Sequence, residues 1–409
     1  MSARPKDIEP ISPIRVSPNG RHFVDRRGEP VFWLADTQWE LFRMFRPDEA
    51  LQLLENRKSK GFNVILIMLM GTARDNEPPR ANVDGETAWV DGDPLKPNEK
   101  YFRHVDEMMR LGERTGQTFV VGVYHKWHVD VITESNARAW ARWLAARYRT
   151  VPNLIWSMYP QAREDFKGVC RELAAGLREG DGGSHLISIH PDPSPASSSF
   201  LHSEPWLAFN MIQTWNDYNL IRDMVTSDYR HTPVRPVVMA EGGYETSRKG
   251  ERVVTAREVR RQAYWTQLAG AYHAYGHDGN WRSPTTWQQW MDSPGSCDLK
   301  LFREIITSCL QWWDLVPDQS MLLAGARSGF ELNAAARSAS GRWALVYLSE
   351  PSTVTVRLDG VANVATVHAE WIDPRTGERT PAGTFVPGGN AEFTTPLGWD
   401  DALVYMEGK

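Results

Sequence analysis

The sequence has few cysteines and no long apolar run, and both scarcities exclude classes of protein. Only three of 409 residues are cysteines, at positions 170, 297 and 309, and none has C-x-x-C spacing. This argues against a disulfide framework and a thiolate zinc site, and it favours a reducing compartment. The longest apolar run, residues 62–70, is too short to cross a bilayer. Because the first twenty residues lack a signal-peptide core, we expect a soluble, cytoplasmic protein.

An excess of charge of one sign is also missing. Lysine and arginine number 46, aspartate and glutamate 51, which leaves a net charge of −5. We therefore expect neither a nucleic-acid nor a membrane partner, and we expect a small carbohydrate as substrate for the reasons below.

Tryptophan, by contrast, is plentiful: of the 18 tryptophans, 15 precede residue 320. Two interpretations stay open, a tryptophan-rich core or indole faces that act as platforms for sugar rings.

Short apolar runs alternate with amphipathic segments through most of the chain, which predicts βα units and a parallel sheet. The predicted strands span residues 31–35, 62–69, 118–124, 154–158, 185–190, 207–212, 236–240 and 271–275. The predicted helices span residues 47–60, 99–114, 135–148, 164–179, 256–269 and 299–313. Eight strands, most followed by a helix, predict a (β/α)₈ TIM barrel, and no G-x-G-x-x-G loop favours a doubly wound nucleotide-binding sheet.

After residue 317 the pattern changes to short strands without helices between them. They are predicted at residues 330–335, 343–348, 353–358, 366–371, 391–394 and 403–406, separated by turn sequences. We expect a barrel over residues 1–318 and a small antiparallel β-sandwich over residues 319–409. Trp343 and Trp371 are expected in the core of that sandwich, which we expect to pack against the barrel.

In a (β/α)₈ barrel the reacting groups come from the C-terminal ends of the strands. Polar and aromatic residues follow almost every predicted strand, which indicates a polar, aromatic-lined pocket suited to a sugar. The expected substrate-binding residues are Trp39, His125, Trp127, His128, Gln161, His190, Gln213, Tyr244, His277, Asp278 and Trp281.

Two carboxylates are the catalytic candidates. Glu241 ends an apolar strand and precedes two glycines, which would let the backbone turn and expose the side chain; the alternative is a buried ion pair with an arginine. Asp36 is either a second reacting carboxylate or, as we favour, an acceptor for sugar hydroxyls, and it could instead cap the following turn.

His125, His128 and Asp130 have a spacing that could hold a metal, but the first strand lacks the H-x-H pair of metal-dependent barrels. We expect no metal and no cofactor.

Several segments together resemble the apiosidase-like glycoside hydrolases, whose (β/α)₈ barrel carries a C-terminal β-domain named as collagen-binding. The matching stretches include VSPNGRHFVDRRGEPVFWLADTQWELF, FLHSEPWLAFNMIQT, MAEGGYE, RRQAYWTQLAGAYHAYGHDGNW and EWIDPRTGE. The resemblance covers nearly the whole chain and is not specific to one substrate. It implies two working carboxylates, an aspartate just after strand four and a glutamate after strand seven that corresponds to Glu241.

The aspartate of that pattern is missing. The segment from Ile155 reads IWSMYPQ, so Gln161 stands where the aspartate is expected, and an amide can neither give a proton to a leaving oxygen nor take one from water. Three interpretations follow. Another acid has taken the role, with Glu164, Asp165, Asp130 or Asp278 within loop reach; one carboxylate suffices; or the barrel binds sugars without cleaving them.

These observations predict a glycoside hydrolase that removes end units from a small oligosaccharide or glycoside. The alternative is a non-catalytic carbohydrate-binding protein on a degenerate barrel. A third idea, that the β-domain tethers the protein to a polymer, has little support because residues 321–409 show no exposed aromatic row.

Overall fold

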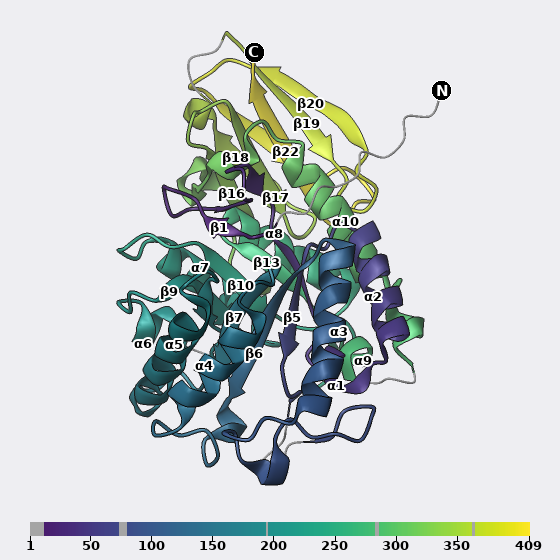
Figure 1. Cartoon of the computed structure of the whole chain (residues 1–409). Helices are drawn as coiled ribbons and strands as arrows, with labels where there is room; N and C mark the ends of the chain where they lie inside the picture. The colour runs from purple at the N-terminus through teal and green to yellow at the C-terminus, as the bar shows by residue number, and fades with distance from the viewer. Residues whose placement is uncertain (1–11, 73–79, 194, 283–285, 362–364) are drawn as a thin grey trace. The chain divides into compact units, whose positions relative to one another are not determined.

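A computed structural model describes residues 12–72, 80–193, 195–282, 286–361 and 365–409 (Figure 1). By its contacts the chain divides into two compact units, residues 1–213 with 276–291 and residues 214–275 with 292–409. The second unit holds two barrel strands together with the C-terminal strands, so these units do not coincide with the domains expected from the sequence. Across the described residues, no helix combines the length and the apolar character needed to cross a membrane.

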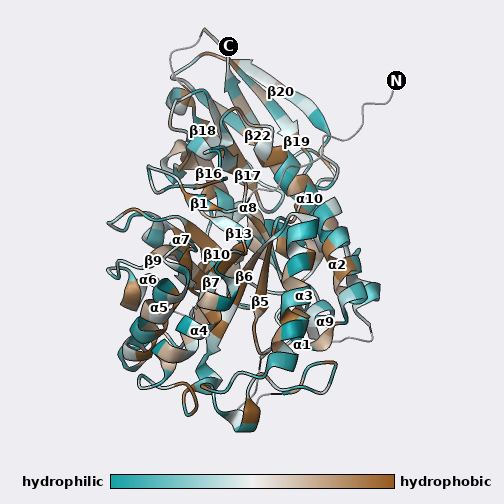
Figure 2. Cartoon of the chain, viewed as in Figure 1, coloured by the Kyte–Doolittle hydropathy of each residue, from teal (hydrophilic) through white to brown (hydrophobic). Residues whose placement is uncertain are grey.

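Eight strands form a closed barrel, which confirms the predicted fold class. In the first unit the strands pair in parallel in chain order: β4 (Leu34–Thr37), β5 (Val64–Met68), β6 (Thr118–His125), β7 (Leu154–Tyr159), β8 (Ile187–Ile189) and β9 (Leu207–Gln213). In the second unit β10 (Val237–Glu241) pairs in parallel with β13 (Tyr272–Tyr275). Each lies within three residues of its predicted bounds. Figure 2 shows β5 and β10 largely in the hydrophobic colour, as expected of strands buried on both faces.

The main helices are α2 (Pro47–Ser59), α3 (Glu99–Thr115), α4 (Ala137–Tyr148), α5 (Lys167–Asp181), α7 (Ile221–Tyr229), α8 (Ala256–Leu268) and α10 (Pro294–Thr307). Their ends follow capping rules: the Asn98 side chain accepts a hydrogen bond from the Lys100 N–H, and Gly116 ends α3 with φ +76°. Prediction missed α7 and misplaced α10, which begins five residues before residue 299. Pro294 occupies its first turn, and the Glu245 carboxylate accepts a hydrogen bond from the Gly295 N–H at 3.0 Å.

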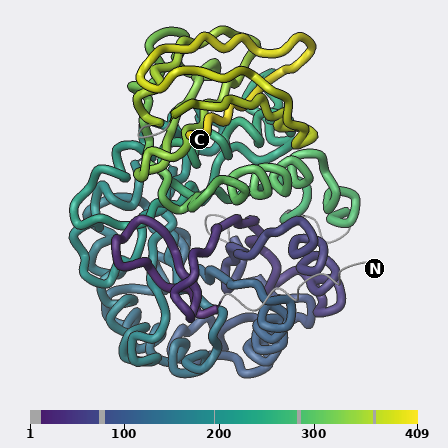
Figure 3. Tube along the Cα trace, turned by 90° about the horizontal axis from the view of Figure 1, so that it is seen from above, coloured from purple at the N-terminus to yellow at the C-terminus, as the bar shows by residue number. Residues whose placement is uncertain are grey.

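Short elements complete the first unit. They are α1 (Leu41–Met44), α6 (Ser198–Leu201), α9 (Asp278–Arg282) and a three-stranded antiparallel sheet of β1 (Arg15–Val16), β2 (Phe23–Val24) and β3 (Pro30–Val31). Figure 3 shows this N-terminal segment in purple. Phe23 stacks on Trp33 at 4.7 Å and meets Phe209 of β9 edge-on at 5.2 Å, so the small sheet is anchored to a barrel strand.

Two antiparallel sheets follow residue 314, which confirms the predicted all-β C-terminal region. One has the order β14-β16-β17-β22-β19-β20 and the other β15-β18-β21. The strands are β14 (Leu315–Pro317), β15 (Leu322–Ala324), β16 (Ala334–Ser338), β17 (Trp343–Leu348), β18 (Thr353–Arg357), β19 (Val367–Ile372), β20 (Arg379–Phe385), β21 (Asn390–Thr394) and β22 (Ala402–Gly408). Trp343 and Trp371 are buried, as predicted. Prediction missed β20, which tolerates Pro381 because it is an edge strand.

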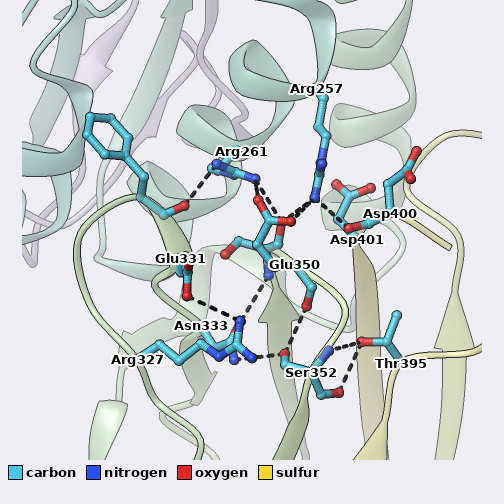
Figure 4. Close-up of polar contacts among 12 residues, drawn as sticks. Arg257, Arg261, Arg327, Glu331, Asn333, Glu350, Ser352, Thr395, Asp400 and Asp401 are labelled. Carbon is cyan, nitrogen blue, oxygen red and sulfur yellow. Dashed lines mark hydrogen bonds and ion pairs between the residues drawn. The ribbon is translucent and has the colours of Figure 1, made fainter.

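Helix α8 is joined to the C-terminal strands through its arginines (Figure 4). Arg260 forms a two-pronged ion pair with the buried Asp401, at 2.9 and 2.7 Å. Arg257 and Arg261 both bind Glu350, and Arg261 also donates to the carbonyl of Ser349 at 3.0 Å. Buried charges are stable only when paired in this way. The expectation that the β-domain packs on a barrel element is therefore confirmed for α8.

Candidate active site

A cluster of rings lies where four strands of the first unit end. Tyr159, the last residue of β7, packs against His190 at 4.4 Å and His125 at 4.9 Å, and Trp39 meets His190 edge-on at 5.1 Å. The Tyr159 hydroxyl donates to Oε1 of Gln213 at 2.7 Å. The structure thus brings together four residues expected from the sequence, Trp39, His125, His190 and Gln213. Tyr159, which the prediction omitted, is the ring that joins three of them.

The histidines of this cluster are neutral. Burial lowers the pKa of His190 to about 3. Burial, and after it the positive charge of Lys126, holds the pKa of His125 well below its usual range. A neutral imidazole offers one hydrogen-bond donor and one acceptor. The cluster therefore suits hydroxyl groups better than an anion.

His128 is a supporting residue of the same loop. Its Nδ1 accepts a hydrogen bond from the backbone N–H of His125 at 3.2 Å, and its ring packs against Trp89. Burial lowers its pKa to about 4. Among the described residues, no group of three or more histidine, cysteine or acidic side chains is arranged to hold a metal ion.

Asp36 is enclosed in the protein rather than presented to a substrate. Its side chain is 0% exposed, and Oδ2 accepts hydrogen bonds from Nε of Arg57 at 2.6 Å and from Nε2 of Gln38 at 2.7 Å. Arg57 lies in α2 and is also fully buried. This arrangement is a structural ion pair. It gives no support to the expected role of Asp36 in chemistry or in contact with sugar hydroxyls.

Gln161 and Trp127 line a cleft of about 570 Å³ between the loops that follow β6 and β7. Asp130 and Asp165, two of the acids named as replacements for the missing aspartate, line the same cleft. Asp165 pairs with Arg163, and Glu164, a third named acid, is 78% exposed and pairs with Lys167 at 2.8 Å. Asp278, the fourth named acid, is not part of the cleft lining. Of the four, Asp130 shares the cleft with Gln161 and has no ion pair among the described residues.

In the second unit, Glu241 is the last residue of β10 and is 7% exposed. Its Oε1 accepts a hydrogen bond from the indole N–H of Trp215 at 3.1 Å. Trp215 is 47% exposed and has φ +47°, a left-handed conformation that is costly for a bulky residue. Such strain clusters at functional sites. Trp215 was not among the residues expected in the site, because its backbone strain has no signal in the sequence.

The two glycines after Glu241 serve close packing rather than a left-handed turn. Neither Gly242 nor Gly243 has positive φ. A Cβ on Gly242 would lie 2.2 Å from Oε1 of Gln262, and the Gly243 N–H donates to that same oxygen at 2.7 Å. The glycines therefore leave room for the α8 side chain of Gln262, which stabilises the segment. Tyr244, expected to bind substrate, follows as a buried residue.

The three residues expected after the last strand lie in a third group. His277 stacks on Trp290 at 4.9 Å, its Nδ1 accepts a hydrogen bond from the Gly279 N–H at 3.1 Å, and burial lowers its pKa to about 4. Asp278 begins α9, which also carries Trp281. The described contacts give His277 a clear structural role within its loop.

Comparisons with known proteins agree with this architecture. The model of the apiosidase-like catalytic domain matches residues 17–314, and that of the "Putative collagen-binding domain of a collagenase" matches residues 316–405. None of the curated proteins compared with the chain matches it.

Solved structures of glycoside hydrolases share the fold. One is 24% identical with a TM-score of 0.88 and covers 97% of each chain. A family 5 glycoside hydrolase from Bacteroides vulgatus is 22% identical with a TM-score of 0.87, over 97% of this chain and 93% of that one. A family 27 β-L-arabinopyranosidase from Geobacillus stearothermophilus is 13% identical with a TM-score of 0.59, over 92% and 97%.

Proposed function

We propose that this chain, which belongs to the apiosidase-like family, is a glycoside hydrolase with Glu241 as a catalytic carboxylate. The observation that carries the proposal is the placement of Glu241 at the end of barrel strand β10, with its carboxylate oriented by the N–H of the strained and exposed Trp215. A carboxylate held in this way can attack an anomeric carbon or activate water. Both are central steps of glycoside hydrolysis.

The proposed substrate is a small neutral oligosaccharide or glycoside, cleaved from its end. Two features support it. The ring cluster of Trp39, His125, Tyr159 and His190 offers aromatic faces and neutral hydrogen-bonding groups, which match the apolar faces and hydroxyls of a sugar. The cleft of about 570 Å³ beside it has the volume usual for a small-molecule site rather than a polymer groove.

The test is replacement of the carboxylate by its amide. We expect Glu241→Gln to lower kcat by about 10²- to 10⁴-fold while the melting temperature stays unchanged, because the amide keeps the size of the side chain and loses its charge. A panel of furanosides and pyranosides, with released sugar as readout, provides the substrate. The control is Asp217→Asn, an exposed acid that pairs with Lys249. Full activity of the Glu241→Gln variant would remove Glu241 from the mechanism.

Gln161 supports a second candidate, a non-catalytic carbohydrate-binding protein. The amide occupies the position of the expected aspartate and lines the cleft, so binding could persist without hydrolysis. Binding of glycosides by the wild-type protein without release of any product across the same panel would favour this candidate over the enzyme.

A further inference from the structure

The cleft beside Gln161 has features of a ligand site in its own right. Two segments line it: the loop after β6, which begins with the 3₁₀ turn Lys126–His128, and the segment from Gln161 into α5. Both segments belong to the first unit. A cleft of about 570 Å³ falls in the range of small-molecule sites.

Tyr124 provides the observation that points to a ligand. It lies on β6, is 0% exposed and lines the cleft, yet its hydroxyl has no hydrogen-bond partner among the described residues. Burial raises its pKa far above the usual value, so the phenol keeps its proton. Buried hydroxyls are almost always hydrogen-bonded, and the cleft is where a partner for this donor can enter.

Trp127 provides a platform at the same cleft. Its side chain is 36% exposed, and the ammonium group of Lys126 lies 4.6 Å from its ring centroid. Lys126 is itself held by Asp192 at 2.5 Å. The indole is therefore supported from one side and open to solvent, an arrangement that suits the C–H face of a sugar ring.

The charges of the cleft favour a neutral ligand. Its two cations are already neutralised, Lys126 by Asp192 and Arg163 by Asp165. Asp130 and Glu134 add negative charge to the lining. A uronic acid would meet repulsion from these carboxylates, whereas the hydroxyls of a neutral sugar can donate to them.

We propose that this cleft binds a neutral sugar unit of the substrate, stacked on Trp127 and hydrogen-bonded by Tyr124, Gln161 and Asp130. The proposed occupant of the cleft is one neutral sugar unit. This inference rests on the proposed glycoside hydrolase function, and it specifies the substrate class and the residues that select it.

The test measures binding, so that its outcome is separate from that of the catalytic proposal. The full chain carrying Glu241→Gln is titrated calorimetrically with neutral xylo-, manno- and cello-oligosaccharides of two to four units, and with oligogalacturonates of the same lengths. We expect a Kd for at least one neutral series and none for the oligogalacturonates. On this background, Trp127→Ala should weaken binding about 10- to 50-fold and Trp127→Phe less than about 5-fold, because the phenyl ring keeps a stacking face.

The sharper variant is Tyr124→Phe, which removes only the hydroxyl. We expect it to weaken binding about 3- to 10-fold and to leave the melting temperature unchanged, because that hydroxyl has no partner among the described residues. The matched control is Tyr264→Phe: Tyr264 is fully buried and stacked on Tyr347, and its hydroxyl likewise has no partner in the described part of the chain. This control should bind like the parent.

Three results would overturn the inference: unchanged affinity in both Trp127→Ala and Tyr124→Phe, tighter binding of oligogalacturonates than of neutral sugars, or no binding of any neutral series. Retained turnover in the Glu241→Gln variant would instead contradict the catalytic proposal alone. The two failures are thus distinguishable.

Discussion

The indole N–H of Trp215 donates to Oε1 of Glu241 at 3.1 Å, and the donor reaches this position from a left-handed backbone conformation. Strand β9 ends two residues before Trp215, and Glu241 ends β10. Trp215 is strained and exposed, and it orients a buried carboxylate. A functional role of that carboxylate explains this arrangement better than a contribution to stability does.

We predict that Trp215→Phe lowers kcat about 10- to 100-fold with little effect on the melting temperature. Hydrogen bonds to charged groups contribute about 1.5–3 kcal/mol, and 1.4 kcal/mol corresponds to tenfold in rate. The backbone strain is the same in both proteins, because phenylalanine also carries a Cβ. Steady-state kinetics provide the measurement, and Trp313→Phe, a half-buried tryptophan elsewhere in the second unit, is the control. Unchanged kinetics in Trp215→Phe would show that the indole does not serve Glu241.

A second prediction concerns the acid that compensates for Gln161. We expect Asp130→Asn to reduce kcat/KM by at least about 10²-fold for substrates with poor leaving groups, and much less for aryl glycosides whose leaving group needs no proton. Asp165→Asn is the matched control, since Asp165 lines the same cleft but is held by Arg163. Equal effects of the two substitutions, or the same loss with both classes of leaving group, would argue that Asp130 is not a proton donor.

The buried pair of Asp36 and Arg57 leads to a prediction about stability. Asp36→Asn should lower the free energy of unfolding by about 3–5 kcal/mol, because it leaves the guanidinium without its charge partner. Denaturant unfolding measures this loss, and we expect the activity per folded molecule to be retained. The double variant Asp36→Asn with Arg57→Met should recover part of the stability. A variant that kept its stability but lost turnover would restore Asp36 as a catalytic candidate.

The buried histidines predict a loss of stability in acid. Burial lowers the pKa of His190 to about 3, of His273 to about 3 and of His128 to about 4, whereas in the unfolded chain each titrates near 6.5. Below pH 6.5 the unfolded chain binds protons that the folded protein does not. Stability is therefore fully present above pH 6.5 and falls as the pH drops toward 4, by about 1.4 kcal/mol per pH unit for each histidine.

Calorimetric melting between pH 7 and pH 4.5 measures this dependence. His190→Gln should flatten the slope in acid, because the amide does not titrate. The same acid sensitivity in wild type and His190→Gln would contradict the assignment for His190.

Much of the fold follows from local patterns. The run FNVILIML and the strand around residues 237–241 are continuous apolar segments bounded by turns, so their strands could be located to within a few residues. For helix α2, Pro47 in the sequence signals the start of the helix, and Gly61 lies just beyond its end. By contrast α10 was misplaced although Pro294, in its first turn, is a local start signal that the prediction overlooked; its start is also stabilised by Glu245, about fifty positions earlier, whose carboxylate accepts a hydrogen bond from the Gly295 N–H.

The ring cluster was predictable in part. Trp39, His125, His190 and Gln213 follow strands, and the parallel barrel brings strand ends together, so topology alone selects them. Tyr159 also ends a strand, so the same rule could have selected it. The sequence could not show that its ring contacts both His125 and His190.

The amino-acid sequence by itself determined the barrel, the all-β tail and the strand ends where polar groups gather, because these depend on periodicity and turn residues a few positions apart. Only the tertiary structure decided which polar groups are enclosed and which face a cleft. It joined Asp36 to Arg57, Glu241 to Trp215 and Gly243 to Gln262. These pairings join residues 19 to 26 positions apart. Whether a carboxylate meets an arginine or an indole depends on how helices and loops pack, which local sequence does not encode.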